Sequence, residues 1–227
     1  MKECGHTSSM SFALERPYKR HYNSELSIWL SVDPMADKYP GVSPYAYCGN
    51  NPVRLVDPNG DTLRFAEGTT PEFQQKFKEA INHLNDNGLG GIASYLHKSD
   101  ITYYIQESSD ENSGFSTNKI ISWNPAFGLS TDQDVVLSPT TILNHELTHA
   151  LIYDLAFHKD KMKEFYAEAY SSSDPDYGSK NEMYVITGVE QRTAKALGEI
   201  KDGQVTRTNH LGTLVKTKGV TSNEVIE

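Results

Sequence analysis

The chain has 227 residues, of which 37% are hydrophobic, so it is long enough for a buried core in one or two domains. Its net charge of −9 argues against nucleic acid as the main partner, because phosphate binding needs a basic surface. Two cysteines, Cys4 and Cys48, are too few for a disulfide framework. No apolar run approaches the roughly 20 residues that span a bilayer, and the first residues lack the apolar core of a signal peptide. We therefore expect a protein made in the cytoplasm without a signal peptide or a membrane span.

Residues 22–60 alternate short apolar runs with turn formers and aromatic residues, which predicts tight turns and short strands. Four sequences follow one another here: WLSVDPM (29–35), SPYAY (43–47), NNPVR (50–54) and VDPNG (56–60). In this order and spacing they resemble the end of the core domain of Rhs (rearrangement-hotspot) repeat proteins. In that family the segment ends a large β-shell around a variable C-terminal toxin, and an Asp-Pro-x-Gly element marks a cleavage junction.

The resemblance implies that the chain has two parts. Residues 1–60 would be the C-terminal remnant of an Rhs core, and residues 61–227 would be the toxin domain. Residues 57–60 match the cleavage element, but Asp61 replaces the apolar residue that usually follows it. Since the long repeat array of the shell is also missing from this sequence, we expect only a turn at residues 57–60.

The next part of the chain alternates strand and helix patterns. Residues 62–66 alternate as a strand does, and Thr70 with Pro71 predicts the start of a helix. Residues 101–105 and 119–123 are rich in β-branched and aromatic side chains, and we expect them to pair as antiparallel strands. The sheet edge near residues 119–123 is a candidate surface for binding a substrate as an added strand.

A buried helix is predicted from about residue 139 to 157, with Ser138 as its N-cap and an apolar series along its length. It carries the sequence His-Glu-x-x-His. Because residues four apart share one face of a helix, His145 and His149 can both direct a ring nitrogen at one metal ion, with Glu146 beside them. This pattern is typical of zinc peptidases, in which the two histidines bind Zn²⁺ and the glutamate is the general base.

A catalytic zinc ion usually takes a third protein ligand, which must come from elsewhere in the chain. Leu155 stands where the metzincin pattern has a third histidine, and His158 lies too far along the helix axis to reach the same ion. A carboxylate on a later helix, predicted at about residues 183–200, remains. Glu190 is the first choice, because its apolar neighbours would turn it inward. The alternatives are Glu182, Glu199 and Asp154, of which the last lies on a different face from His149.

Three further elements are predicted after the helix with the two histidines. Residues 159–170 should form a second helix with apolar side chains on one side. Residues 171–180, rich in Ser, Asp and Gly, should form a loop, and residues 205–215 a final hairpin.

Two short motifs carry a second resemblance. The sequence HELTHA at residues 145–150 is followed by EQRT at residues 190–193. Together they resemble the secreted effector metallopeptidases of bacterial pathogens, in which His-Glu-Leu-x-His-Ala precedes Glu-x-Arg-Thr on a later helix. The resemblance implies a zincin-like α+β fold, with a small and mostly antiparallel sheet and an active-site helix, and zinc held by His145, His149 and Glu190.

The expected chemistry follows from this ligand set. Zn²⁺ lowers the pKa of its water toward roughly 7 and polarises the scissile carbonyl. Glu146 accepts the proton and passes it to the leaving amine. The developing oxyanion needs a donor besides the metal, for which His210 is the first choice and Tyr177 and Tyr184 are the alternatives.

The two resemblances predict a zinc metallopeptidase that forms the toxin part of an Rhs-type polymorphic toxin. It would be made in the bacterial cytoplasm, be delivered into a target cell, cut a protein there and be matched by a cognate immunity protein. Two alternatives stay open at this point. One is a non-catalytic Rhs remnant that serves in binding or assembly, and the other is a zinc amidase that acts on the cell wall.

Overall fold

The computed structural model describes residues 62–108, 112–158 and 160–226, together with two short strands and three single residues in the first 60 positions. The chain divides into two compact units, Met1–Gly60 and Asp61–Glu227. In the first unit, β1 (Tyr22–Asn23) pairs with β2 (Ile28–Trp29) in antiparallel fashion. Most of the Rhs-like sequences, including the predicted turn at residues 57–60, lie outside the described residues.

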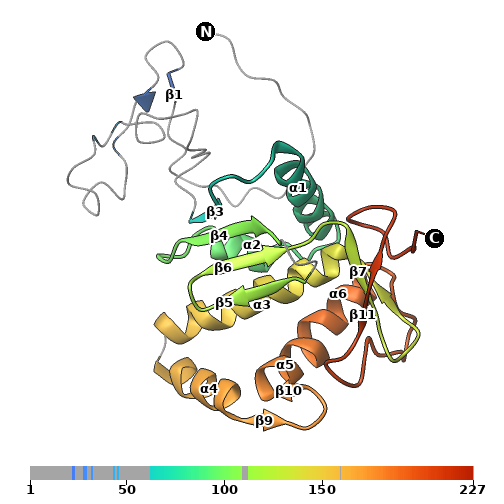
Figure 1. The fold of residues 1–227 in the computed structure, drawn as a ribbon. Coiled ribbons are helices and arrows are strands. Elements are labelled where there is room, and N and C mark those ends of the chain that lie inside the picture. The colour runs from blue at the N-terminus through green and yellow to red at the C-terminus, as the bar shows by residue number, and fades with distance from the viewer. Residues whose placement is uncertain are drawn as a thin grey trace. The chain divides into compact units, whose positions relative to one another are not determined.

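The larger sheet of the second unit has the strand order β3-β4-β6-β5 (Figure 1). Its strands are β3 (Leu63–Phe65), β4 (Tyr103–Glu107), β5 (Gly114–Ser116) and β6 (Ile120–Trp123). β4 is parallel to both β3 and β6, and only β5 is antiparallel to its neighbour. The sheet is therefore mixed, and not mostly antiparallel as the sequence predicted.

The predicted antiparallel pairing of residues 101–105 with residues 119–123 is wrong. Tyr104 stands opposite Ile120 in a parallel register, because the polar segment between them contains β5, which supplies the antiparallel partner of β6. β6 consequently lies inside the sheet, and the edge predicted near residues 119–123 is formed by β5 instead.

The apolar core lies under this sheet. α1 (Pro71–Asp86) begins as predicted, with the Thr70 side chain accepting a hydrogen bond from the Phe73 amide, and α2 (Gly91–Leu96) follows. The rings of Phe73 and Phe77 lie 5.8 and 6.2 Å from the ring of Trp123, which is fully buried. The Trp123 indole N–H donates to the Pro139 carbonyl over 2.8 Å, so the core is tied to the next helix.

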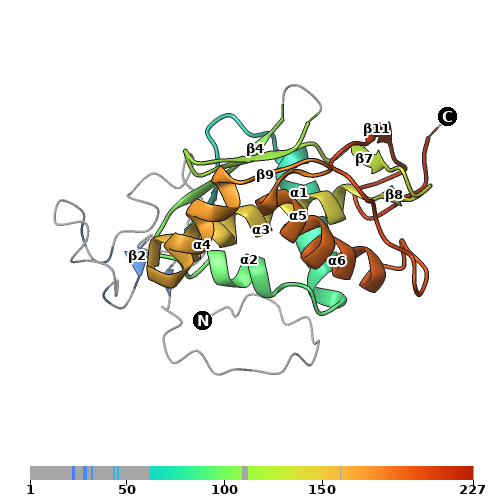
Figure 2. The same cartoon turned by 90° about the horizontal axis from the view of Figure 1, so that it is seen from below.

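That helix is α3 (Pro139–His158), and it runs between the larger sheet and the helices that follow (Figures 1 and 2). The Ser138 hydroxyl accepts from the Thr141 amide over 3.2 Å and caps its start, as the sequence predicted. Leu143 and Leu147 are completely buried in the core. α4 (Asp160–Ser171) packs against α3.

The helical segment predicted at residues 183–200 starts earlier and ends earlier. It consists of α5 (Lys180–Val185), a π-helical turn η3 (Ile186–Glu190) and α6 (Gln191–Ala196). The start moves to Lys180 because the Ser179 side chain caps the Glu182 amide. The end moves because Gly198 adopts φ of 74°, a left-handed conformation that stops the helix. The predicted loop before it contains the short pair β9 (Ser173–Asp174) and β10 (Gly178–Ser179).

A smaller antiparallel sheet has the order β11-β7-β8 and contains β7 (Phe127–Ser130), β8 (Val136–Leu137) and β11 (Thr213–Lys216). The hairpin predicted at residues 205–215 is wrong, since β11 pairs with the distant β7 and residues 201–212 form a loop. The chain then returns to α3, where the Val220 carbonyl accepts from Thr140. No helix in the described part of the chain is long and apolar enough to cross a membrane.

The burial of α3 predicts a large stability cost for shortening its core side chains. Leu147→Ala should lower the free energy of unfolding by about 2–5 kcal/mol, because it leaves a cavity between α3 and the sheet. Leu211→Ala is the control, since Leu211 is 74% exposed and its truncation should change little. Chemical denaturation of both variants checks the difference, and equal stabilities would contradict the assigned packing.

Candidate active site

Three side chains converge beside the middle of α3. The Nε2 atoms of His145 and His149 lie 3.0 Å apart. One carboxylate oxygen of Glu182 lies 3.2 Å from His145 Nε2, and the other lies 3.2 Å from His149 Nε2. These three residues form the group within the described residues that could hold a metal ion.

The sequence of each helix explains this convergence. The four-residue spacing of His145 and His149 places both on one face of α3. Glu182 lies in the first turn of α5, and the Ser179 cap fixes where that turn begins. Because α5 packs against α3, the Glu182 side chain meets both histidines.

The donor set fits a zinc ion. Tetrahedral zinc with bonds of about 2.0–2.1 Å to nitrogen and oxygen separates its ligand atoms by about 3.3 Å. Here the two Nε2 atoms are 3.0 Å apart, and each lies 3.2 Å from a different oxygen of the Glu182 carboxylate. Moreover, Glu182 Oε2 is buried beside His145 Nε2 at 3.2 Å, and a buried carboxylate oxygen is costly unless positive charge meets it.

Each histidine also has a partner on its other ring nitrogen. His145 Nδ1 lies 2.9 Å from Glu190 Oε2, and His149 Nδ1 lies 2.8 Å from the side-chain amide nitrogen of Asn181. The Asn181 Oδ1 is buried without a hydrogen-bond partner in the described part of the chain. Turning this amide by 180° would give His149 Nδ1–H an acceptor, as metal-binding histidines require.

Glu190, the third ligand expected from the sequence, is therefore placed on the other side of His145 from Glu182. It is 2% exposed, and Arg207 donates to it from Nε over 3.0 Å and from Nη2 over 2.5 Å. Burial alone would raise the pKa of Glu190, but the hydrogen bond with His145 and the Arg207 guanidinium hold it at about 2. Glu190 is thus a buried carboxylate that holds His145 from behind.

The charges around His145 bear on metal binding. Burial alone would lower the pKa of His145, but hydrogen bonds to the Glu182 and Glu190 carboxylates raise it to about 10. The same carboxylates that attract a proton would attract a cation, and a metal ion bound at His145 would displace that proton.

Glu146 lies next to this group and is buried. Burial raises the pKa of its carboxyl, and the negative charge of Glu182 adds to the rise, while His145 and His149 act in the opposite direction. A carboxylate in such surroundings accepts a proton more readily than one in water, which suits a general base.

The candidates for stabilising an oxyanion lie in different places. His210 Nε2 is 3.6 Å from Glu182 Oε2, so it is at the edge of the cluster with about half of its side chain exposed. Tyr184 packs its ring against Phe165 at 5.1 Å. Tyr177 lies on the turn between β9 and β10, where its amide donates to Asp174.

The remaining sequence candidates are outside the cluster. His158 lies 3.7 Å from Asp154, and Asp154 accepts a hydrogen bond from the Tyr103 hydroxyl. Glu199 accepts from the Thr141 hydroxyl over 2.8 Å at the start of α3. All three therefore lie toward the ends of α3 and not beside the two histidines.

The sequence did not predict a role for three residues near the site: Asn181, Arg207 and Tyr170. Asn181 directly precedes Glu182, and Tyr170 lies near enough that burial, Tyr166 and the Glu182 charge all raise its pKa. A signal existed for Tyr170 in the aromatic run at the end of α4, but an arginine among threonines in a loop gave none for Arg207.

The motif residue Thr193 joins the two helical segments. Its hydroxyl accepts from the Asn144 side chain over 2.8 Å and donates to the Val189 carbonyl over 2.8 Å. Because Asn144 precedes His145 and Thr193 follows Glu190 by three residues, this contact fixes α6 against α3 beside the cluster.

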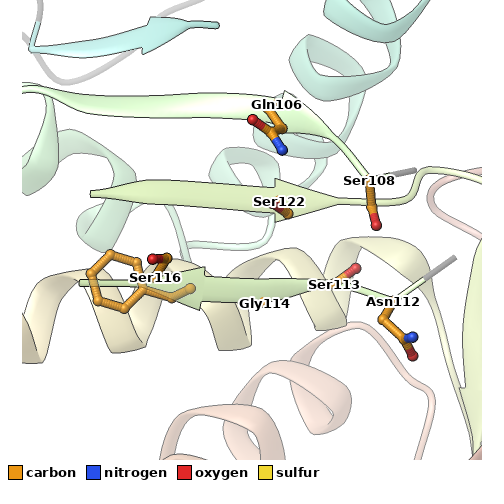
Figure 3. Close-up of a pocket in the computed structure, with 8 residues that line it drawn as sticks. Gln106, Ser108, Asn112, Ser113, Gly114, Ser116 and Ser122 are labelled. Carbon is orange, nitrogen blue, oxygen red and sulfur yellow. The ribbon is translucent and has the colours of Figure 1, made fainter. Parts of the chain in front are cut away.

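A polar hollow of about 370 Å³ lies over the strands β4, β6 and β5 of the larger sheet (Figure 3). Gln106, Ser122 and Gly114 stand opposite one another on three neighbouring strands and line it with uncharged groups. None of the converging side chains borders the hollow. β5 itself packs against α3, and its second edge has no strand partner among the described residues.

Comparison with known proteins identifies a family. The sequence profile of the family Peptidase M91, described as an effector protein, matches residues 58–198, which is more than half of the chain. Neither a curated protein nor a solved structure matches the chain significantly. The matched stretch contains His145, His149, Glu182 and Glu190, but it ends before Arg207 and His210.

The low pKa of Glu190 predicts how stability depends on pH in metal-free protein. A carboxyl whose pKa is about 2 when folded and about 4.5 when unfolded stabilises the fold above pH 4.5, and this stabilisation is lost as the pH falls toward 2. The loss is about 3 kcal/mol. Glu190→Gln should be less stable at neutral pH and show a flatter curve. Urea unfolding between pH 2 and 7 measures the free energy of unfolding of both proteins. Parallel pH curves for wild type and Glu190→Gln would contradict the low pKa of Glu190.

Proposed function

The chain belongs to the Peptidase M91 family of effector proteins, and we propose that it is a zinc-dependent peptidase with His145, His149 and Glu182 as the metal ligands. The observation that carries this proposal is the convergence of two Nε2 atoms and one carboxylate at 3.0–3.2 Å. Glu182 takes the place in the ligand set that the sequence assigned to Glu190. Glu190 instead holds His145 through Nδ1, as carboxylates behind metal-binding histidines do.

The chemistry is divided between the metal held by its three ligands and two further side chains, Glu146 and His210. When bound, zinc supplies a Lewis acid that makes a water more acidic and polarises the scissile carbonyl. Glu146 accepts the proton of the attacking water and passes it to the leaving amine. His210 lies 3.6 Å from Glu182 and is exposed enough to meet a substrate, so it donates to the oxyanion.

The substrate backbone lies along β5. This strand packs against α3, and its second edge has no strand partner among the described residues, so an extended peptide can add to the sheet through main-chain hydrogen bonds. Such binding depends little on side chains, which accommodates a protein substrate whose sequence is not otherwise constrained.

The Rhs-like sequences before residue 61 and the match to the effector family support a biological setting for this activity. We place the chain as the toxin part of an Rhs-type polymorphic toxin, delivered from a bacterium into a target cell, where it cuts a protein. A cognate immunity protein would protect the producing cell. The family match begins at residue 58, inside the last of the Rhs-like sequences (56–60).

Metal analysis tests the ligand set. Wild-type protein should bind one zinc ion per chain, and His145→Ala, His149→Ala and Glu182→Ala should each lose it. Glu190→Ala should keep the site but bind zinc about 10–100-fold more weakly, because only the support of His145 is lost. Glu164→Ala, an exposed carboxylate on α4, is the control. Zinc retained in Glu182→Ala and lost in Glu190→Ala would restore the ligand set expected from the sequence.

Activity tests the role of Glu146. Glu146→Gln should bind zinc normally and lower kcat by about 10²–10⁴-fold, because the amide cannot accept the proton. If expression of the wild-type protein is toxic to cells, expression of Glu146→Gln should not be. Comparing the proteins cut in cells that express wild type and Glu146→Gln identifies the substrate. Unchanged proteins together with altered peptidoglycan would show that the site acts on the cell wall instead.

A further inference from the structure

Arg207 makes a charged contact with Glu190, which is not one of the proposed metal ligands. Its side chain is 6% exposed, and its guanidinium contacts both oxygens of Glu190, with Nε 3.0 Å from Oε1 and Nη2 2.5 Å from Oε2. The same Oε2 lies 2.9 Å from His145 Nδ1. Arginine, carboxylate and imidazole thus form a continuous buried chain that ends at the Nε2 of His145.

We propose that Arg207 is a positioning residue for the metal centre and that it acts through Glu190 on His145. A carboxylate held at both oxygens by a planar fork has one orientation. Here that orientation directs a lone pair of Oε2 at His145 Nδ1, which fixes the ring tautomer and turns Nε2 toward Glu182 and His149. This inference rests on the proposed zinc function.

The segment that carries Arg207 is itself held in place by the domain. The Thr206 amide donates to Gln191 Oε1 over 2.9 Å, and the Thr206 carbonyl accepts from Thr131 over 2.7 Å. On the other side, the Thr208 amide donates to Asp132 over 3.1 Å. Gln191, the variable position of the EQRT motif, therefore anchors the loop that completes the site.

Arg207 also contacts the loop that carries it. Arg207 Nη1 donates to the His210 carbonyl over 3.1 Å, so the same guanidinium that orients Glu190 also fixes the backbone of His210. His210 Nε2 in turn faces Glu182. Arg207 consequently links the metal ligands to the proposed oxyanion donor.

Arg207 differs from the arginine that the sequence motif contains. Arg192 lies in the EQRT motif, but its side chain is exposed, and its Nε donates to the Gly188 carbonyl of its own helix. Arg207 lies beyond residue 198, where the family match ends. The structure therefore assigns to residues 199–210 a part of the site that the matched stretch does not contain.

Zinc affinity, measured by competition with a chelating dye, tests the proposal. Arg207→Met should weaken zinc binding by about 10–100-fold, as loss of outer support for a ligand does. Arg207→Lys should weaken it less, since a lysine restores the charge but not the two-pronged contact. Arg192→Met is the matched control and should bind zinc like wild type. Thermal unfolding in the presence of a chelator reports separately on the fold.

A double-mutant cycle shows whether Arg207 acts through Glu190. In a Glu190→Gln background, Arg207→Met should weaken zinc binding little further, whereas a general loosening of the fold would add its full effect. Wild-type affinity in Arg207→Met, or full additivity in the cycle, would overturn the inference. If wild type and Arg192→Met both bind no zinc, the proposed function fails instead. Should Arg207→Met not fold, Arg207→Lys in the same cycle answers the question.

Discussion

The burial of ionisable groups beside one apolar helix is the constraint on which the rest of this domain depends. His145, Glu146 and His149 are each less than one-tenth exposed, and so are Glu190 and Arg207. Removing such groups from water costs several kcal/mol each unless opposite charges and hydrogen bonds meet them. These partners come from two segments that lie well after α3 in the sequence. They are the α5–η3–α6 run and the loop after it. Their position is dictated by charge compensation as much as by apolar packing.

α3 is suited to this role because its two sides are held by different means. Toward the sheet, Leu143 and Leu147 pack in the core around Trp123. At its ends, polar contacts take over: Thr140 donates to the Val220 carbonyl, and Asp154 accepts from Tyr103. A helix fixed on one side and at both ends can present histidines on its remaining side with little freedom of movement, which is what preorganised metal binding needs.

Local patterns predicted the elements well, and long-range partners poorly. The cap at Ser138 and the spacing of His145 and His149 are short-range features, and the structure brings their ring nitrogens to 3.0 Å as a helix dictates. The choice between Glu182 and Glu190 depends on how α5 lies against α3, which neither helix encodes alone. The antiparallel prediction for β4 and β6 failed for the same reason, because strand order is set by β5 inserting at the edge. The contact of Arg207 with Glu190 could not be predicted from the sequence, since only the tertiary fold brings that loop to Glu190.

The π-helical turn η3 (Ile186–Glu190) explains how two glutamates of one helical run contact His145 from two sides. Glu190 follows Glu182 by eight positions, and at about 100° per residue these would differ by roughly 80° around a regular α-helix. A π-turn absorbs one additional residue, which reduces the difference to about 20°. Both carboxylates then face α3, one toward Nε2 and the other toward Nδ1 of His145. An inserted residue in the helix has thus become a means of angular alignment, and the length of this run is as much a part of the site as its side chains.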